Sequence, residues 1–227
     1  MNHLQVRFCE DTKLEVGVDE AGRGCLWGPL YAAAVIWPPE ENWLEEHREI
    51  APLIKDSKKL SAKKRKVLAE QIKAIAIDHG IGSVSAKEID QGGMTYANRL
   101  AFLRAIEGLS VPVDRVLIDG CLPLRAEQLE SLKIDEQETI VDGDALYLPI
   151  AAASIVAKES RDTLVEEWVK KEPILQTDYN IGSCKGYGTE KHRKAILEKG
   201  MHAQHRRLFL RKLLNISVND CMISDES

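Results

Sequence analysis

Two adjacent acids, Asp19 and Glu20, stand between an apolar segment and a glycine-rich turn. Residues 14–18 have the composition of a β-strand, and residues 22–24 read Gly-Arg-Gly. Carboxylates bind divalent cations, glycines leave backbone N–H groups open to a ligand, and an arginine presents a planar fork to an anion. The stretch therefore indicates a metal ion beside a phosphate or a sugar. A charged hairpin turn without function is the simpler alternative, and the glycines argue against it.

Two further acids follow predicted strands. Asp119 comes directly after residues 115–118, and Asp144 follows residues 139–141. In parallel sheets, ligands collect at the carboxyl ends of the strands, so these acids converge with the first pair if the strands are neighbours. Hard oxygen ligands favour Mg²⁺ or Mn²⁺, and two such ions about 3.5–4 Å apart can promote phosphodiester hydrolysis. For Asp119 alone, an ordinary turn would be the better interpretation.

The charged residues are unevenly distributed along the chain. The net charge of −5 by itself argues against a nucleic-acid ligand. Residues 55–73, however, carry eight Lys or Arg against two acids, and residues 185–212 carry nine against two. Two basic stretches in an otherwise acidic chain are typical of a protein that binds a polyanion, although two solvated helix faces would give the same pattern.

Length and composition exclude several protein classes. With 227 residues, 44% of them hydrophobic, the chain suffices for one large domain or for a core with a smaller lobe. No run of about 18 apolar residues and no apolar leader is present, so we expect neither a membrane span nor a signal peptide. The five scattered cysteines favour reduced thiols and a cytoplasmic location over a disulfide framework or a zinc site.

Alternating strand and helix patterns predict an α/β layer with parallel strands in its second half. We expect strands at residues 14–18, 31–37, 81–85, 115–118 and 139–141, a polar connection at 38–49, and helices beginning after an N-cap at Ser61 and at 95–109 and 150–169. A second, helical lobe follows from residue 185 to residue 214, and the polar residues 217–227 are expected to be disordered.

Several polar residues receive structural interpretations rather than catalytic ones. Lys158, Arg161 and Asp162 are expected on the polar face of the longest helix, whose first two turns are small and apolar throughout. His192, His202 and His205 lack the i, i+4 spacing of a helical zinc pair, so we expect them to be solvated or to face phosphate.

Six blocks of residues occur in order between residues 14 and 210. They are Asp19-Glu20-Ala21-Gly22-Arg23-Gly24 with Gly28-Pro29, Asp56-Ser57-Lys58-Lys59-Leu60-Ser61, Ile118-Asp119-Gly120, Gly143-Asp144, residues 151–158 with Arg161-Asp162, and Lys185-Gly186-Tyr187-Gly188-Thr189 with His192. Together they resemble ribonuclease HII, the type 2 ribonucleases H. The first block is highly specific, and the blocks around Ser154 and Tyr187 reinforce it.

The resemblance implies an α/β fold, a ribonuclease H-like mixed five-stranded sheet flanked by helices, with three antiparallel strands followed by parallel ones and a C-terminal helical lobe. We therefore expect one catalytic domain over residues 12–214, with a sheet core at about 12–170, a helical lobe at about 185–214 and a disordered tail at 215–227. The implied activity is endonucleolytic hydrolysis of the RNA strand of RNA–DNA hybrids. It extends to incision 5′ of ribonucleotides embedded in duplex DNA, leaving 3′-hydroxyl and 5′-phosphate ends.

The resemblance also assigns residues. It implies that the catalytic metal ligands, for two Mg²⁺ or Mn²⁺ ions, are Asp19, Glu20, Asp119 and Asp144. It implies that the residues that bind the substrate are Gly22, Arg23, Gly24, Tyr187, Lys58, Lys59 and Lys185. The Gly-Arg-Gly turn would read the 2′-hydroxyl group, and Tyr187 would stack on the sugar of the following deoxynucleotide. We expect no organic cofactor, no membrane partner and a monomeric protein that removes ribonucleotides in DNA replication and repair.

Two residues depart from the family pattern, and two alternative functions stay open. Asp142 replaces the usual Lys before Gly-Asp, and Cys184 replaces the usual His before Lys-Gly-Tyr. A resolvase- or transposase-like DNA nuclease of the same fold would need no reader of the 2′-hydroxyl group. A non-catalytic module that binds hybrids would be indicated by the loss of a carboxylate, and all four are present.

Overall fold

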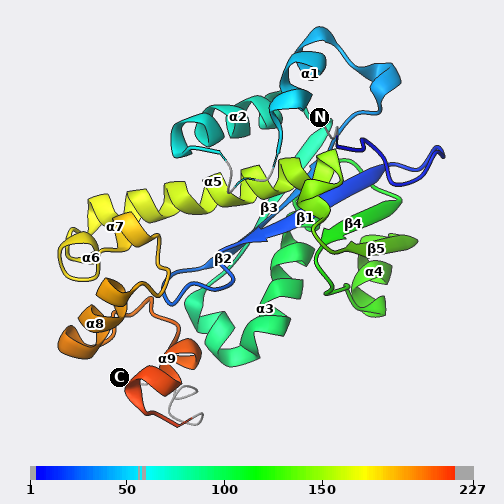
Figure 1. The fold of residues 1–227 in the computed structure, drawn as a ribbon. Helices are drawn as coiled ribbons and strands as arrows, with labels where there is room; N and C mark the ends of the chain where they lie inside the picture. The colour runs from blue at the N-terminus through cyan, green and yellow to red at the C-terminus, as the bar shows by residue number, and fades with distance from the viewer. Residues whose placement is uncertain (1–3, 56, 58–59, 218–227) are drawn as a thin grey trace. The chain divides into compact units, whose positions relative to one another are not determined.

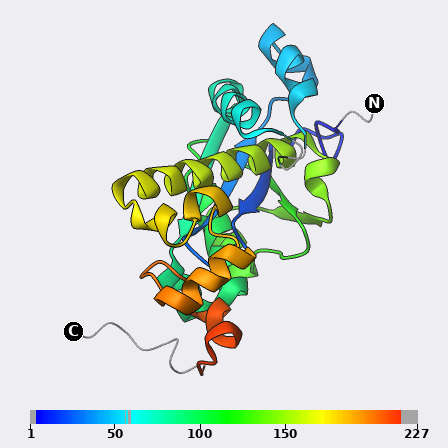
Figure 2. The same cartoon turned by 60° about the vertical axis from the view of Figure 1, so that its left-hand side comes forward.

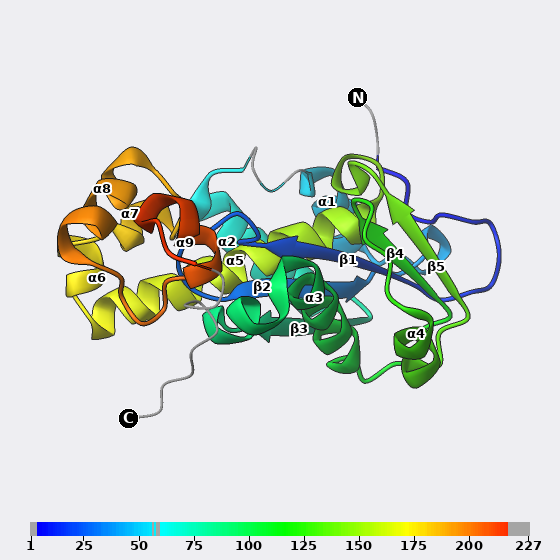
Figure 3. The ribbon, with the colours of Figure 1, turned by 90° about the horizontal axis from the view of Figure 1, so that it is seen from below.

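A five-stranded mixed sheet organises the first part of the molecule (Figures 1 and 3). The computed structural model describes residues 4–55, 57 and 60–217. The strands are β1 (Glu15–Ala21), β2 (Leu30–Ile36), β3 (Asp78–Val84), β4 (Arg115–Asp119) and β5 (Glu136–Ile140). They lie in the order β3-β2-β1-β4-β5. β1 is antiparallel to β2 and parallel to β4, and β4 is parallel to β5.

The chain divides into two compact units. The first contains the chain up to Ala21, Tyr31–Ser83 and Arg99–Glu159, and the second contains Gly22–Leu30, Val84–Asn98 and the chain from Ser160 onward. The helices are α1 (Glu45–Ile50), α2 (Ala62–Ile75), α3 (Ala86–Glu107), α4 (Ala126–Leu132), α5 (Leu148–Lys171), α6 (Ile174–Thr177), α7 (Ile181–Cys184), α8 (Glu190–Lys199) and α9 (Arg207–Leu214). Both α3 and α5 contribute residues to each unit.

The core of the first unit lies between one face of the sheet and helices α2 and α5. One buried cluster contains Ala33 and Val35 of β2, Leu68 and Ile72 of α2, and the apolar residues between 151 and 157 of α5. The first turns of α5 are small and apolar, as predicted. Because their alanine side chains are short, the helix can approach the sheet closely. Figure 1 shows α2 and α5 on this side of the strands, and the final turns of α3 on the other.

Backbone contact fixes the first half of β1 against the start of α5. A Cβ atom added at Gly17 would lie 2.2 Å from the carbonyl carbon of Pro149, so any side chain there would displace the helix. The residues that follow Gly17 on β1 are therefore held at a set distance from the first turns of α5. This packing positions the acids at the end of the strand.

The second unit has its own hydrophobic core. Trp27 is fully buried in it, and its ring meets Trp168 of α5 edge to face, with centroids 5.4 Å apart. The other buried members are Val165, Leu175, Tyr179, Ile181, Ala195, Ile196 and Leu210. Helices α8 and α9, orange to red in Figure 2, supply the last of these residues.

The structure confirms the predicted fold class and most predicted elements. Ser61 is the N-cap of α2, with its hydroxyl accepting from the Lys64 N–H at 3.4 Å. The polar connection predicted at 38–49 is wrong in part, since α1 begins at Glu45, and α4 was not predicted. Lys58, Lys59 and all but the first residues of the predicted tail lie outside the described residues. Among the helices that the structure describes, none is long and apolar enough to cross a membrane.

Candidate active site

Asp19 and Asp119 lie at the adjacent ends of two parallel strands. The register of β1 and β4 pairs Val18 with Ile118, so the two acids follow side by side. Asp19 is 6% exposed, and its Oδ1 accepts a hydrogen bond from the Glu20 N–H at 2.6 Å. The strand-end rule therefore places these acids together, as expected from the sequence for neighbouring strands.

Asp144 reaches the same group through a tight turn after β5. Asp119 Oδ1 accepts from the Gly143 N–H at 2.8 Å and from the Asp144 N–H at 3.4 Å. Asp142, just before, takes a left-handed conformation with φ of 55°. A Cβ at Gly143 would lie 2.8 Å from Ile150 Cδ1 and 3.2 Å from Asp119 Oδ1, so a larger residue would require Ile150 to move and would crowd the carboxylate. The N–H groups of Gly143 and Asp144 thus tie the turn after β5 to the Asp119 carboxylate at the end of β4.

The electrostatics of this group favour a cation. Burial raises the pKa of Asp19 well above its ordinary value, and the carboxylates of Glu20 and Asp119 raise it further. A hydrogen bond with Ser154 acts in the opposite direction. Ser154 Oγ in turn lies 3.1 Å from Ser57 Oγ. The ionised form of Asp19 is thus disfavoured unless positive charge is brought close to it.

The donor set fits a hard divalent cation. All four predicted ligands, Asp19, Glu20, Asp119 and Asp144, offer carboxylate oxygens, the donors that Mg²⁺ and Mn²⁺ prefer. Within the described part of the chain, no three His, Cys, Asp or Glu side chains are already grouped as a complete metal-binding set. The strand register and backbone hydrogen bonds bring Asp19, Asp119 and Asp144 near one another, and rotation of their side chains would be needed to complete a ligand set around an ion.

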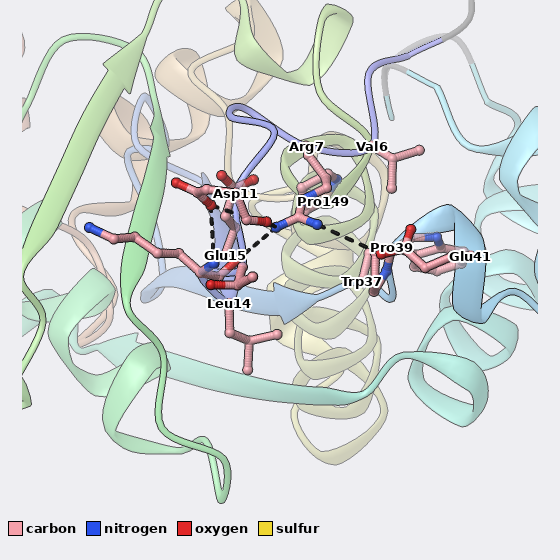
Figure 4. Close-up of a pocket in the computed structure, with 11 residues that line it drawn as sticks. Val6, Arg7, Asp11, Leu14, Glu15, Trp37, Pro39, Glu41 and Pro149 are labelled. Atoms are coloured by element: carbon pink, nitrogen blue, oxygen red, sulfur yellow. Dashed lines mark hydrogen bonds and ion pairs between the residues drawn. The ribbon is translucent and has the colours of Figure 1, made fainter.

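A cavity of about 290 Å³ opens at the opposite end of β1, beside Glu15 (Figure 4). Its charged groups pair with one another, since Arg7 lies 3.7 Å from Asp11 and 3.9 Å from Glu41. About four residues, or roughly 13 Å of strand, separate Glu15 from Asp19. The cavity therefore holds none of the residues that the sequence singled out for chemistry.

The Gly-Arg-Gly turn of residues 22–24 belongs to the second unit. The Cys25 N–H donates to the Gly22 carbonyl at 3.2 Å and closes the turn. Gly22 has φ of 90°, a conformation that side chains disfavour. Arg23 and Gly24 are exposed, and a Cβ on Gly24 would meet no described atom within 4 Å. The turn thus presents its middle residues to solvent, where a ligand can reach them.

Two arginines that contact this loop are fully buried. Arg206 Nη1 donates to the carbonyls of Gly22 at 2.8 Å and Arg23 at 3.1 Å. Arg161 Nε donates to the Pro29 carbonyl at 3.0 Å. The prediction that Arg161 lies on a polar face is therefore wrong, because backbone carbonyls replace water as its partners. Nothing in the sequence analysis singled out Arg206.

Tyr187 and Lys185 lie beside the same loop. Cys25 and Tyr187 form an isolated antiparallel bridge, and Arg161 Nη1 donates to the Lys185 carbonyl at 2.8 Å. The Tyr187 side chain is 41% exposed, whereas Lys185 Nζ pairs with Glu166 at 2.9 Å. Of the predicted substrate-binding residues that the structure describes, the second unit thus gathers the glycine turn and the tyrosine.

Two histidines expected in solvent are buried instead. His192 and His205 are 0% and 2% exposed, and their Nε2 atoms lie 2.9 Å apart. His205 Nδ1 accepts from the His202 N–H, so His205 donates through Nε2 to His192, whose Nδ1 donates to the Tyr187 carbonyl at 2.9 Å. Burial lowers the pKa of both rings, that of His205 to about 3. The neutral pair therefore supports the tyrosine loop and does not face phosphate.

Comparison with known proteins gives a consistent family. Residues 16–212 match the family model described as ribonuclease HII. The ribonuclease HII of Synechococcus sp. (strain CC9902) is 44% identical over 87% of this chain and 92% of its own length. That of Trichodesmium erythraeum (strain IMS101) is 44% identical over 86% of each. The crystal structure of ribonuclease H2 from Pyrococcus horikoshii OT3 has a TM-score of 0.67 at 27% identity, and the alignment covers 88% of this chain and 97% of that one.

Proposed function

Because the chain belongs to the ribonuclease HII family and is a ribonuclease H, an endonuclease acting on RNA–DNA hybrids, we propose that it also incises duplex DNA 5′ of embedded ribonucleotides. Each cut would leave a 3′-hydroxyl and a 5′-phosphate. The observation that carries the proposal is the meeting of Asp19 and Asp119 at the ends of β1 and β4, where like charges share one buried edge. That arrangement lowers stability and is expected where a cation is used.

Members of this family depend on a divalent cation, and four residues would hold it here. These are Asp19, Glu20, Asp119 and Asp144. Bound Mg²⁺ or Mn²⁺ supplies a Lewis acid for the phosphoryl oxygen and lowers the pKa of a bound water. The Gly143 N–H holds the Asp119 carboxylate in place. The hydrogen bond with Ser154 and the Glu20 N–H favour the ionised form of Asp19, in which it can act as a ligand.

The second unit would select the substrate. The exposed backbone of Arg23 and Gly24 would contact the 2′-hydroxyl group, and the half-exposed ring of Tyr187 would stack on the next deoxyribose. Lys185, and Lys58 and Lys59 outside the described residues, would contact phosphates. A DNA nuclease would have no use for the first of these contacts, so selection against an all-DNA duplex distinguishes the proposals.

The test is cleavage of a labelled duplex that carries one ribonucleotide, with Mg²⁺ or Mn²⁺, beside an RNA–DNA hybrid and an all-DNA duplex of the same sequence. We expect cutting of the first two and none of the third, with ends that a ligase and a phosphatase identify as 3′-hydroxyl and 5′-phosphate. Cutting of the hybrid alone would restrict the function to hybrids. Cutting of all three would favour the DNA nuclease.

We further propose a cytoplasmic, monomeric enzyme that removes ribonucleotides during DNA replication and repair. Among the described residues, Cys9, Cys25, Cys121 and Cys184 are thiols that form no disulfide, which supports a reducing compartment. Light scattering of the purified protein, with and without the ribonucleotide duplex, tests the monomer.

A further inference from the structure

Arg206 is a buried cation whose partners are backbone carbonyls of one loop. Its Nη1 donates to the carbonyls of Gly22 and Arg23, and its Nε donates to the Gly28 carbonyl at 2.8 Å. Burial lowers the pKa of Arg206 to about 10, which still leaves the guanidinium charged at neutral pH. Moving such a group out of water costs several kcal/mol unless strong acceptors replace the water. Here the loop's own carbonyls are those acceptors.

Because the peptide unit is planar, a contact that fixes the direction of a carbonyl also fixes the direction of the N–H group that follows it. The described residues contain no cis peptide bond, and in a trans peptide the C=O and the following N–H point in opposite directions. With the Gly22 carbonyl on Arg206, the Arg23 N–H points away from it. With the Arg23 carbonyl on Arg206, the Gly24 N–H does the same. Both N–H groups are thus directed to the exposed side of the turn, as in an anion-binding nest of successive amides.

Arg161 prevents the turn from shifting. A Cβ at Gly22 would lie 2.1 Å from Arg161 Nε, so the arginine side chain fills the space that any other residue would need. The same guanidinium reaches the Trp27 carbonyl at 3.0 Å and, as described above, the Lys185 carbonyl. Leu26 N–H donates to the Gly186 carbonyl at 2.8 Å. The turn and the segment that carries Tyr187 are therefore fastened to one another.

Building on the function proposed above, we propose that Arg206 is a positioning residue for ribonucleotide selection, which aims the N–H groups of Arg23 and Gly24 by holding the carbonyls of the preceding residues. The charge on Arg206 has a second effect on these amides. A cation at the carbonyl oxygen polarises the peptide and makes its N–H a stronger donor. The ligand group recognised is a hydroxyl or an anionic oxygen, and in the duplex it is the 2′-hydroxyl beside its phosphate.

Three substitutions separate position from charge. Arg206→Lys keeps the charge, but an ammonium on a shorter side chain cannot reach three carbonyls as the planar fork does. Arg206→Met removes both the charge and the fork. Arg207→Met is the matched control, since Arg207 is the exposed neighbour in the chain and its side chain is held by none of these carbonyls.

The experiment measures the dissociation constants of the full-length protein for two duplexes in EDTA, where no cutting occurs. One duplex carries a single ribonucleotide and the other is its all-DNA counterpart, and their ratio is the selectivity. We expect Arg206→Lys to lower the selectivity about tenfold, the net worth of one neutral hydrogen bond, and Arg206→Met, which also loses the polarising charge, to lower it further. Arg207→Met should weaken both complexes by a similar factor and leave the ratio unchanged.

The outcomes keep the inference separate from the function on which it rests. If the wild type prefers the ribonucleotide duplex and both Arg206 variants prefer it by the same factor, the positioning role is overturned and the proposed function stands. Equal affinity of the wild type for the two duplexes would overturn recognition of the ribonucleotide itself, and the inference with it. If Arg206→Met fails to fold, as judged by circular dichroism, the charge-preserving Arg206→Lys decides the matter.

Discussion

Strands β1 and β4 run side by side, with opposite charges paired at one end and like charges placed together at the other. At the beginning of the pair, the register sets Glu15 beside Arg115, whose Nη1 donates to Glu15 Oε1 at 2.6 Å. At the other end, the same register sets Asp19 beside Asp119. Opposite charges therefore hold one end together, whereas at the other end burial, and after it the neighbouring like charges, raise the pKa of Asp19.

The first end is a network and not a single pair. Arg115 Nη2 also lies 2.7 Å from carboxylate oxygens of Asp11 and Glu136. The contact with Arg115 lowers the pKa of Asp11, and hydrogen bonds from Lys13 and then from Arg115 lower that of Glu136. The same contacts raise the pKa of Arg115. The Glu15 carboxylate additionally accepts from the Phe8 N–H at 2.8 Å. The comparison teaches that the ion-pair network and the candidate metal site are separated along one strand pair, and this separation can be tested from either end.

The largest expected effect is on cleavage. Asp119→Asn keeps the shape of the side chain but removes a charge from the candidate ligand set, so cleavage of the ribonucleotide duplex should fall about a thousandfold. Binding of the uncut duplex should be largely retained. Glu136→Gln, the same chemical change at the other end of the neighbouring strand β5, should cut at nearly the wild-type rate. Near-normal cleavage by Asp119→Asn would show that this acid is no ligand.

The next effect is on stability. Arg115→Met leaves Glu15 buried without its cation, and losing one partner of such a pair costs about 3–5 kcal/mol of unfolding free energy. Urea unfolding followed by circular dichroism measures the loss. Lys13→Met, which removes the exposed partner of Glu136, should have a much smaller effect. Equal effects of the two substitutions would contradict the role given to burial.

At the acidic end, removal of a charge should stabilise the protein. Asp19→Asn relieves the repulsion from Glu20 and Asp119, and its amide can still accept from the Glu20 N–H. In EDTA we expect a gain of about 0.5–2 kcal/mol in unfolding free energy, as is common when a functional site is relaxed. Saturating Mg²⁺ should reverse the order of the two proteins. A less stable variant in EDTA would show that these like charges are already neutralised.

A pH series sharpens the same contrast. The pKa of Asp11 and of Glu136 is lowered from the ordinary 3.8 and 4.5, so their contribution to stability is present above those values. It is lost as the pH falls through the lower pKa of the folded state. The stability difference between wild type and Arg115→Met should therefore shrink below about pH 4.5. A constant difference down to pH 3 would exclude these acids as the source.

The smallest effect is expected at Asp142, where the resemblance to ribonuclease HII implies a lysine. Asp142→Lys changes the charge by two units close to Asp144, but Asp142 is exposed and screening acts over about 8–10 Å. We expect the Mg²⁺ concentration for half-maximal cleavage to rise about twofold. Asp142→Asn, which also tolerates the left-handed backbone, is the control for conformation. Superimposable Mg²⁺ titrations of the wild type and Asp142→Lys would show that the charge at this position does not affect the metal requirement.

The acids could be found from the sequence because their signal is local. An apolar run that ends in Asp19 or Asp119 predicts a strand end, and the parallel arrangement brings such ends together. The helix α4 was missed because its seven residues carry no buried side chain and hence no apolar stripe. The local sequence pattern thus predicted the strands and the acids at their ends better than it predicted the polar helices.

The buried arginines show where local pattern fails. Arg161 lies four residues before the fully buried Val165 and so shares its helix face, a signal that the polar character of the residue concealed. Arg206 has no such signal. Its partner Gly28 is 178 positions away, and a backbone carbonyl of any residue type serves equally well as an acceptor. No periodicity in the chain can report a contact of that kind.

The register between β1 and β4 also sets an order of events in synthesis. Glu15 and Arg115 meet although they lie 100 positions apart. At about 5–20 residues per second, the ribosome releases the second strand roughly 5–20 s after the first. Until then the acids at the end of β1 have neither their neighbours from β4 nor the helix that packs on Gly17. Parallel pairing across so long a loop is slow, so we expect the acids at these strand ends to come together late in the folding of the nascent chain.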